Sequence, residues 1–210
     1  DTSVLLGTPR GAGTVGGMIA AGLAGPRRIK AGAARDHLLG ANAVSGFGDS
    51  FKTGGKVVKN VTGYDLCKLL AGSWGTLSVM TEVTLKVLPK AETERTLVLR
   101  GLDDVTANRV MTTAIGSPYD VSGVAHIPAS IFRDTGDGLS GLGSSQQAVT
   151  LIRLEGIGAS VPHRAGSVSS ALASFGTAEM IADEASAALW AAIRAVTPFA
   201  ASGPLGAWPV

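Results

Sequence analysis

Three glycines near the start of the chain have the spacing of a nucleotide-binding motif. Gly11, Gly13 and Gly16 follow the pattern G-x-G-x-x-G, and Asp36 lies twenty positions after the last of them. In a Rossmann unit such glycines join a strand to a helix and let main-chain amides approach a pyrophosphate, while an acid about 20 residues on binds a ribose hydroxyl. Dinucleotide binding is therefore the first chemical hypothesis.

The residues around these glycines argue against a Rossmann unit. The candidate first strand, residues 3–6, is interrupted by Gly7 and Pro9, and Asp36 precedes a predicted strand instead of ending one. The run 25–35 lacks the length and alternation of a second parallel strand. A nicotinamide-dependent Rossmann enzyme is therefore the least favoured of three interpretations.

The other two interpretations concern the doublet Gly16-Gly17 and the small residues after it. The glycines could simply allow a loop to pack tightly against a helix. Alternatively, amides at the start of a short helix could form an anion cradle, because they lack helical partners and the helix end is partially positive. Small residues at Ala20, Ala21 and Ala24 would then let a flavin dinucleotide lie close to the main chain.

The elements expected to position these residues are short and rich in turns. They are a helix of two or three turns within 14–25 that Gly25 and Pro26 close, a β-hairpin with strands 37–44 and 50–58, a helix that Thr62 caps and Gly72 ends, and a strand at 76–89. Capping residues, turn glycines and alternation of apolar residues support them. Together they predict a small α+β unit.

Beyond Pro89 the pattern changes, and we place a domain boundary near 90–94. The predicted elements are strand 94–101, helix 102–116, strand 120–128, strand 145–156, helix 162–176, strand 178–181 and a last helix at 183–196. The order β-α-β-β-α-β is that of a ferredoxin-like fold. The glycine-rich run 133–145 is expected to be a mobile connector.

Composition limits the partners that the chain can have. Lys and Arg number 18 and Asp and Glu 16, a near balance that does not favour a nucleic-acid binder. One cysteine, Cys67, cannot form an internal disulfide, and no apolar run approaches the roughly 20 residues of a membrane span. We therefore expect a cytoplasmic protein. Because it starts at Asp1 without Met and stops at Val210 after what reads as a new strand, we expect a fragment of a longer polypeptide.

Three blocks of sequence resemble a known flavoprotein family. They are 14–40, 59–89 and the motif IRLEG at 152–156. The first two carry TVGG, GAARD, TGYD and GSWGTLSVMTE, which follow patterns of the vanillyl-alcohol oxidase/p-cresol methylhydroxylase (PCMH) superfamily. Within that superfamily the chain resembles the FAD-binding subunits of bacterial glycolate oxidase.

This resemblance implies an α+β fold, a cofactor and a site. Residues 1–90 would be the second, C-terminal subdomain of a PCMH-type FAD-binding domain, and 91–210 an incomplete FAD-linked oxidase cap domain with the ferredoxin-like fold. FAD would be the cofactor. The residues implied near its diphosphate and ribityl chain are Thr8, Pro9, Thr14, Gly16, Gly17, Ala21, Ala24 and Gly25, and those near its adenosine are Gly75, Thr76, Val79 and Met80.

Two departures from the family pattern affect this expectation. The family carries a glycine-rich pyrophosphate loop in an N-terminal subdomain, and no equivalent precedes Asp1. We therefore expect the 210 residues to bind FAD weakly or not at all by themselves. In addition, Trp74 stands where many members have Glu, so this position cannot make a carboxylate contact.

The family also implies an activity and partners. It would be the oxidation of glycolate, a 2-hydroxy acid, to glyoxylate with electron transfer through flavin, in a complex with a second flavoprotein subunit and an iron–sulfur subunit. The complex would hold the chain at the inner face of the membrane through those subunits. The alternative is a non-catalytic assembly subunit, or a fragment, that keeps the fold without binding flavin.

The remaining candidate residues point to no metal and identify no catalytic group. Arg27, Arg28 and Lys30 could supply a cation for a substrate carboxylate, but a basic cluster in a loop more often faces solvent, a phosphate or a partner. His37, His126 and His163 lack the spacing of a metal site, so we expect no metal and mainly structural histidines. A general base among them stays open.

Overall fold

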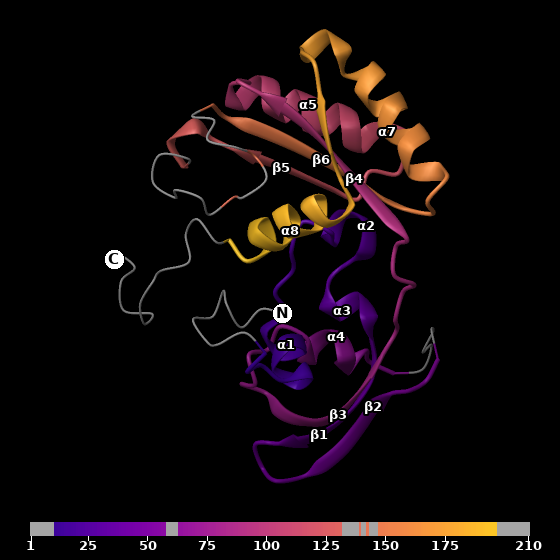
Figure 1. The fold of residues 1–210 in the computed structure, drawn as a ribbon. Coiled ribbons are helices and arrows are strands. Elements are labelled where there is room, and N and C mark those ends of the chain that lie inside the picture. Colours follow the sequence, from indigo (N-terminus) through magenta and orange to yellow (C-terminus); the bar gives the residue numbers. More distant parts are fainter. Residues whose placement is uncertain (1–10, 58–62, 132–138, 140–141, 143–146, 197–210) are drawn as a thin grey trace. The chain divides into compact units, whose positions relative to one another are not determined.

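A computed structural model describes residues 11–57, 63–131, 139, 142 and 147–196 of the chain (Figure 1). These residues form two compact units. Unit 1 contains 11–28 and Gly32–Pro89, and unit 2 contains Ile29–Ala31 and the described residues from Lys90 onward. Most of the run 133–145, for which we expected a mobile connector, lies outside the described residues.

Unit 1 is built on a three-stranded antiparallel sheet of order β2-β1-β3. Its strands are β1 (Leu38–Ser45), β2 (Ser50–Gly54) and β3 (Ser78–Leu85). The turn between β1 and β2 closes with the Ser45 amide donating to the Asp49 carbonyl at 2.9 Å, which confirms the predicted hairpin. Four short helices accompany the sheet: α1 (Val15–Ala21), α2 (Arg28–Ala31), α3 (Ala34–His37) and α4 (Leu66–Leu70). The last three residues of α2 count with unit 2.

The core of unit 1 lies between its sheet and the helices α1 and α4. Ile19 of α1 packs with Leu38 of β1 and Cys67 of α4, and a second group joins Ala41, Ala43 and Leu70. Met80 and Val83 of β3 touch both groups. The sheet is therefore covered on one face by very short helices.

Several predicted boundaries in unit 1 were wrong. The helix α4 begins at Leu66, because the Asp65 carboxylate accepts the Lys68 amide at 3.3 Å and so forms the N-cap; Thr62 lies outside the described residues. The helix α1 ends before Gly22, whose φ of 64° forms a left-handed cap, and not at Gly25. The strand β3 ends at Leu85, short of Pro89.

Unit 2 contains a four-stranded antiparallel sheet of order β5-β6-β4-β7. The elements are β4 (Thr93–Arg100), α5 (Asp104–Gly116), β5 (Gly123–Ile127), β6 (Val149–Gly156), α7 (Ser160–Ala171), β7 (Glu179–Ala182) and α8 (Asp183–Arg194). Every neighbouring pair of strands is antiparallel. The predicted ferredoxin-like order of elements is therefore confirmed.

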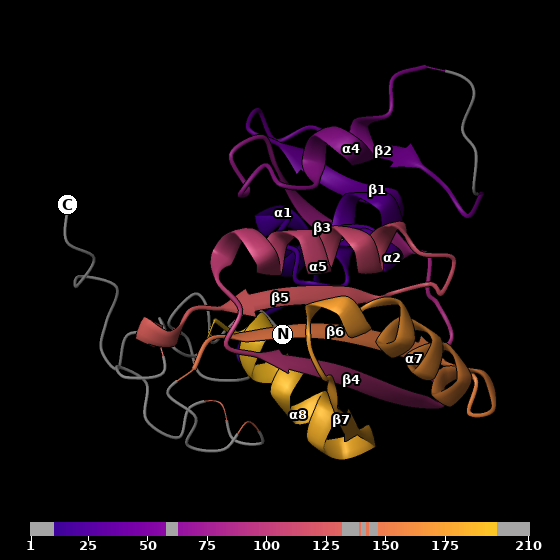
Figure 2. The same cartoon turned by 90° about the horizontal axis from the view of Figure 1, so that it is seen from above.

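Both faces of the unit 2 sheet are covered by helices (Figures 1 and 2). On one face Leu97 and Leu99 of β4 pack with residues of α5 and α7. On the other face Val98 and Leu151 pack with Leu189 and Trp190 of α8. Alternate residues of β4 therefore serve two separate cores, as the period-two geometry of a strand requires.

Two general properties follow from the described part of the chain. None of its helices has the length and apolar character that crossing a bilayer requires. Within those same residues, no group of His, Cys, Asp and Glu side chains is arranged to hold a metal ion.

Candidate functional site

The residues for which we predicted an anion cradle lie at the start of α1. Thr14 is the N-cap: its Oγ1 accepts the Gly17 amide at 2.9 Å, and its carbonyl accepts the Met18 amide at 3.0 Å. The Gly17 amide is thus already bonded within the chain and does not point at a ligand, contrary to our expectation of unpaired donors at both glycines. Because the Thr14 hydroxyl accepts this bond, its own O–H can still donate to an anion.

The region around Gly16 joins the two predicted groups of site residues. A Cβ atom added to Gly16 would lie 3.7 Å from the carbonyl oxygen of Met80, the nearest atom outside the helix. The start of α1 therefore lies beside β3, and residues some sixty positions apart in the sequence form one surface of unit 1, here called the α1 flank. It consists of 14–22, 72–77 and 79–80.

The other end of α1 is fixed by close contact between two main-chain segments. The Gly72 amide donates to the Ile19 carbonyl at 3.1 Å and the Trp74 amide to the Ala20 carbonyl at 2.9 Å. A Cβ atom on Gly22 would lie only 2.8 Å from Gly72 Cα, and Gly22 has a positive φ. Glycine at position 22 is therefore required for this packing.

The predicted site residues differ in how they are exposed. On the α1 flank Thr14 and Gly17 are exposed and Gly16 is half-buried, whereas Ala21 is buried in the core. Beyond the flank, Ala24 and Gly25 are exposed. Thr8 and Pro9 lie outside the described residues.

The residues predicted near an adenosine lie in the turn before β3 and in its first half. Gly75 and Thr76 are exposed, and the Thr76 hydroxyl donates to the Ser73 carbonyl at 2.7 Å. Val79 is 67% exposed. The Met80 side chain instead packs into both core groups of unit 1, so only its main chain faces Gly16.

Apolar side chains are unusually exposed on the α1 flank. Val15 is 55% exposed, Leu77 49% and Trp74 59%. Trp74 also has a φ of 55°, a left-handed conformation that is rare for a bulky residue. Sequence reasoning noted Trp74 only as a departure from the family pattern, because no motif predicts an exposed, left-handed tryptophan.

The charges near α1 favour anions. The segment 11–35 contains Arg27, Arg28, Lys30 and Arg35 and no acidic residue. Arg27 and Arg28 are exposed. Lys30 forms an ion pair with Asp120 of unit 2, so it is a weaker candidate for a substrate carboxylate than the sequence suggested.

The Rossmann interpretation is wrong. Both described sheets are antiparallel, whereas a Rossmann unit requires parallel strands. Asp36 lies in α3, before β1, and its carboxylate accepts the Ala33 amide at 2.8 Å. That hydrogen bond lowers the pKa of Asp36 and gives its side chain a structural role.

The histidine of unit 2 that most resembles a catalytic base, His126, bridges two polar residues and lines a cavity. His126 Nε2 donates to Asp104 at 3.2 Å, and its Nδ1 lies 3.0 Å from Thr150 Oγ1. Thr150 is fully buried, so no substrate reaches its hydroxyl group. A cavity of about 290 Å³ beside β5 and the end of α8 is lined almost wholly by apolar side chains and does not suit a hydroxy acid.

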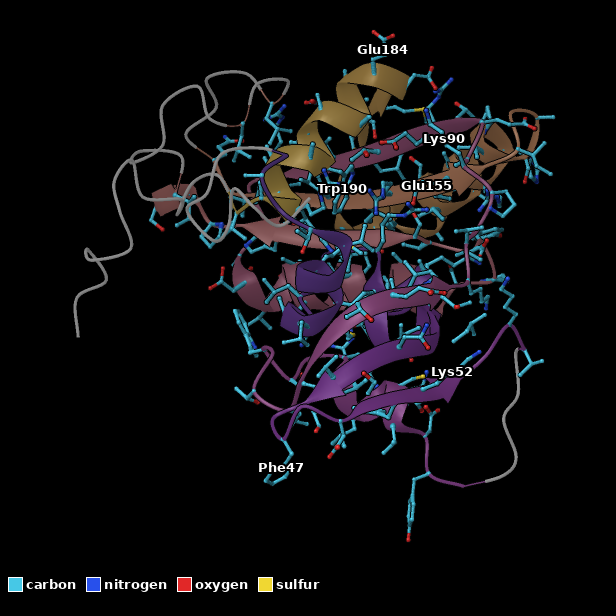
Figure 3. All side chains as sticks on the ribbon, turned by 90° about the horizontal axis from the view of Figure 1, so that it is seen from below. Phe47, Lys52, Lys90, Glu155, Glu184 and Trp190 are labelled. Carbon is cyan, nitrogen blue, oxygen red and sulfur yellow. The ribbon has the colours of Figure 1, made fainter. Side chains whose placement is uncertain are left out.

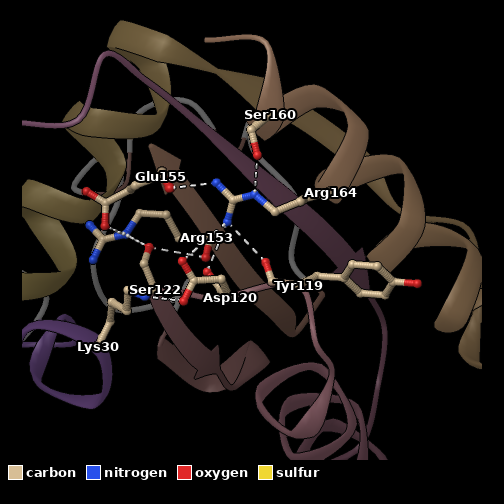
Figure 4. Close-up of polar contacts among 8 residues, drawn as sticks. All are labelled: Lys30, Tyr119, Asp120, Ser122, Arg153, Glu155, Ser160 and Arg164. Carbon is tan, nitrogen blue, oxygen red and sulfur yellow. Dashed lines mark hydrogen bonds and ion pairs between the residues drawn. The ribbon is translucent and has the colours of Figure 1, made fainter. Parts of the chain in front are cut away.

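Two arginines of unit 2, Arg153, which is buried, and Arg164, which is half-buried, were not predicted (Figure 4). Arg153 of β6 is 5% exposed, and its guanidinium lies 3.3 Å from Glu155 and 4.5 Å above the ring of Trp190. Arg164 of α7 donates to the carbonyls of Glu155 at 2.8 Å and Tyr119 at 3.1 Å. Arg153 lies inside an apolar run of the predicted strand, and this position could have indicated a buried charge. We considered the residue only as part of the family motif IRLEG.

Comparison with known proteins finds relatives that are similar to part of the chain. No family model matches the chain. Glycolate oxidase subunit GlcE of Escherichia coli (strain K12) is 53% identical over 77 residues, which are 37% of this chain and 22% of that protein. D-lactate dehydrogenase of Archaeoglobus fulgidus is 46% identical over 77 residues, 37% of this chain and 17% of the enzyme.

The name of another relative includes the cofactor FAD. The FAD-linked oxidoreductase MT2338 of Mycobacterium tuberculosis (strain CDC 1551 / Oshkosh) is 43% identical over 79 residues, 38% of this chain and 17% of that protein. The chain thus spans less than a quarter of the length of each of these relatives.

A solved structure of alkyldihydroxyacetonephosphate synthase is similar over most of the chain. The TM-score is 0.65 at 18% identity, and the match covers 88% of this chain and 36% of the synthase. This likeness confirms the predicted α+β fold class, that of PCMH-type FAD-binding proteins. At such low identity it shows the fold alone.

Proposed function

We propose that this chain is part of an FAD-dependent oxidoreductase that oxidises a 2-hydroxy acid. The observation that carries the proposal is the 53% identity to a glycolate oxidase subunit over 77 residues, together with an α1 flank that can accept an anionic dinucleotide. D-lactate dehydrogenase, a relative at 46% identity, also acts on a 2-hydroxy acid. Glycolate is the substrate that we propose, with glyoxylate as the product.

The residues of the α1 flank fit FAD. Gly16 has no side chain, and the space that a Cβ would enter is bounded only by the Met80 carbonyl at 3.7 Å. The Thr14 hydroxyl can donate to a phosphate oxygen, and the absence of acids from 11–35 removes repulsion of a diphosphate. FAD, when bound, supplies the hydride acceptor of the reaction.

The proposed roles of the chain's own residues follow from their positions. Thr14 and Gly16 would hold the diphosphate, with the exposed main chain of Ala24 and Gly25 as a second support. Gly75, Thr76 and Val79 would contact the adenosine from the opposite side of the α1 flank. Thr8 and Pro9, outside the described residues, stay part of the proposal, whereas Ala21 and Met80 contribute mainly to packing. Arg28 is an exposed cation that would contact an acid or a phosphate.

The proposed partners are those of a multi-subunit glycolate oxidase. They are a second flavoprotein subunit and an iron–sulfur subunit, which would receive the electrons and hold the chain at the inner face of the membrane. The name of the relative, a subunit of glycolate oxidase, supports assembly with other subunits. The alternative proposal is an assembly subunit that keeps this fold without flavin.

A binding experiment tests the cofactor. FAD is titrated into the 210-residue chain by equilibrium dialysis up to millimolar concentration, with circular dichroism to establish folding. Gly16→Ala places a methyl group where there is room for it, so the fold should survive while FAD affinity falls about tenfold, equivalent to about 1.4 kcal/mol.

Gly46→Ala is the matched control. A Cβ at Gly46, in the β1–β2 turn, meets no atom within 4 Å, so the fold should tolerate it and the FAD affinity of this variant should equal that of the wild type. FAD uptake that Gly16→Ala leaves unchanged would contradict the proposed site.

A further inference from the structure

The helix α8 is joined to the sheet of unit 2 without a linker. The strand β7 ends at Ala182 and α8 begins at Asp183. The helix then crosses the face of the sheet opposite α5 and α7 (Figures 1 and 2). Because no residue separates β7 from α8, the change of direction must come from the main-chain torsion angles at the junction itself.

Both ends of α8 carry a non-glycine residue in the left-handed region. Asp183 has a φ of 45° and Val196, just beyond the helix, a φ of 50°. Asp tolerates this region better than most residues, but a β-branched valine there is an outlier. Such conformations persist only where the surrounding structure enforces them, and they gather at hinges and switches. The docked position of α8 is therefore a strained one.

The contact between α8 and the sheet is held by polar groups to an unusual degree. Ser186 and Thr96 are both fully buried, with 2.7 Å between their hydroxyl oxygens. Ser186 donates to Glu94 at 2.6 Å, and Trp190 Nε1 donates to Thr96 at 2.7 Å. Figure 3 labels Trp190 and Glu155 of this part of unit 2. When α8 opens, water can replace these hydrogen bonds, so each of them contributes only modestly to the docked position of the helix.

A buried ion pair also lies under α8. Arg153 stacks on Trp190 and faces Glu155, and a Cβ at Gly123 would come within 3.4 Å of the Trp190 ring and 3.2 Å of the guanidinium. Removing charged groups from water carries a desolvation cost that their attraction only partly offsets. Opening of α8 would return water to these charges, which lowers the cost of opening.

Other contacts hold α8 closed. Leu189 is fully buried in the second core cluster, and Asp183 forms an ion pair with Arg95 at 2.6 Å. These contacts anchor the helix without removing the strain at its two ends.

We propose that α8 is a strap that opens from the sheet of unit 2 as one element, with hinges at Asp183 and Val196. In the closed state it covers Thr96, Arg153 and Glu155, and in the open state this polar part of the sheet meets solvent. The proposal concerns unit 2 alone and is independent of flavin binding or of any activity.

Native-state hydrogen exchange on the 210-residue chain tests the strap. With increasing denaturant, the amides of α8 should exchange by a local opening that is at least tenfold more frequent than the exchange of the α5 and α7 amides, and less sensitive to denaturant. If the α8 amides follow the same denaturant dependence and the same rate as those of α5 and α7, α8 opens only by unfolding of the whole unit and the proposal is wrong.

A pair of variants at Val196 tests the origin of the opening. Val196→Gly accepts the left-handed conformation without strain, so exchange of the α8 amides should slow about fivefold. Val196→Ala shortens the side chain but keeps the strain of a Cβ atom, so it should leave the exchange close to that of the wild type. Equal exchange in the two variants would overturn the hinge at Val196.

Trp190 gives an independent readout. It is 2% exposed, so acrylamide should quench it poorly in a chain whose other tryptophans are replaced, Trp74→Phe and Trp208→Phe. Thr96→Val removes the hydrogen bonds to Ser186 and Trp190 and should raise quenching at least twofold while the amides of α5 keep their protection. Unchanged quenching, or loss of α5 protection as well, would contradict the strap.

Discussion

The two units of the chain are stabilised in different ways. The α-helices of unit 2 that cover its sheet have 12 or 13 residues, and the fully buried side chains between them and the sheet include Leu97, Leu154 and Leu189. The α-helices of unit 1 have only four to seven residues, and its core contains several alanines. Unit 2 therefore depends on apolar burial.

Unit 1 depends instead on close approach of main-chain segments. Gly22 meets Gly72, and Gly54 lies against Leu39, where a side chain would collide with main-chain atoms. Small side chains and close backbones produce a surface on which main-chain groups and hydroxyls are within reach of a ligand. The comparison teaches that the candidate site and the larger apolar core lie in separate units of this chain.

The largest effect is expected where unit 1 is tightest. Gly54 has a φ of 63°, and a Cβ atom there would lie 2.1 Å from the Leu39 carbonyl oxygen. Gly54→Ala should therefore lower the free energy of unfolding of unit 1 by about 3–5 kcal/mol, the upper range for single substitutions. Hydrogen exchange of the β1 amides, recorded at increasing urea concentrations, measures this loss of stability.

Gly63→Ala is the control for backbone strain alone. Gly63 has a φ of 81° and no atom within 4 Å of its added Cβ, so the loss should be about 1 kcal/mol. Equal losses at the two positions would show that main-chain contact does not stabilise unit 1.

The next effect tests apolar burial in unit 2. Leu154 of β6 is fully buried against α5 and α7, so Leu154→Ala should lower the free energy of unfolding of unit 2 by about 2–5 kcal/mol. Exchange of the β4 amides in urea would report it, while the β1 amides of unit 1 keep their protection. The exposed Leu69→Ala in unit 1 is a control of the same chemistry and should cost much less.

The two units are stabilised in different ways, and this difference explains which of their elements could be predicted from the sequence. In unit 2 the apolar strand runs and the helical period of α5 predicted the strands β4 to β7, the helices α5, α7 and α8 and their order, because apolar burial leaves a pattern in the sequence. In unit 1 the hairpin and the strand β3 were predicted, but α2 and α3 were not. Helices of four residues leave no periodic pattern to detect.

The candidate site was predicted only as a set of segments. The family resemblance assigned Thr14, Gly16 and Met80 to one flavin site, and in the structure a Cβ atom added to Gly16 would lie 3.7 Å from the Met80 carbonyl oxygen. It could not show that Thr14 caps Gly17 or that Met80 turns into the core, because both depend on side-chain geometry. Nor could it show the strain at Trp74.

A pH effect should appear in unit 2 at the start of α5. Asp103 accepts hydrogen bonds from the Thr106 amide at 2.9 Å and from its hydroxyl at 2.8 Å, and these bonds hold the pKa of Asp103 below its ordinary value of 3.8. A lowered pKa in the folded state means that the cap contributes its full stability above about pH 4. That contribution is lost as the pH falls through the lowered value.

Asp103→Asn separates the charge from the cap. Asparagine caps a helix about as well as aspartate, so Tm at pH 7 should change little, whereas the loss of stability between pH 4 and pH 2 should be smaller than in the wild type. Thermal unfolding at several pH values measures both. A variant with the same acid dependence as the wild type would mean that Asp103 does not contribute to it.

The smallest effect concerns the thiol of Cys67, which reports on how often unit 1 opens. Cys67 is 2% exposed, and burial raises the pKa of its thiol. Burial and the raised pKa both lower the fraction of Cys67 that is present as accessible thiolate. Modification by Ellman's reagent should therefore be at least a hundredfold slower than in the urea-unfolded chain.

Because unit 1 has the smaller apolar core, Cys67 should nevertheless react through openings that leave the β4 and β6 amides of unit 2 protected. Gly54→Ala should speed the reaction and Leu154→Ala should not. Equal acceleration by the two variants would mean that the two units open together. The units would then differ in how they are packed but not in how stable they are.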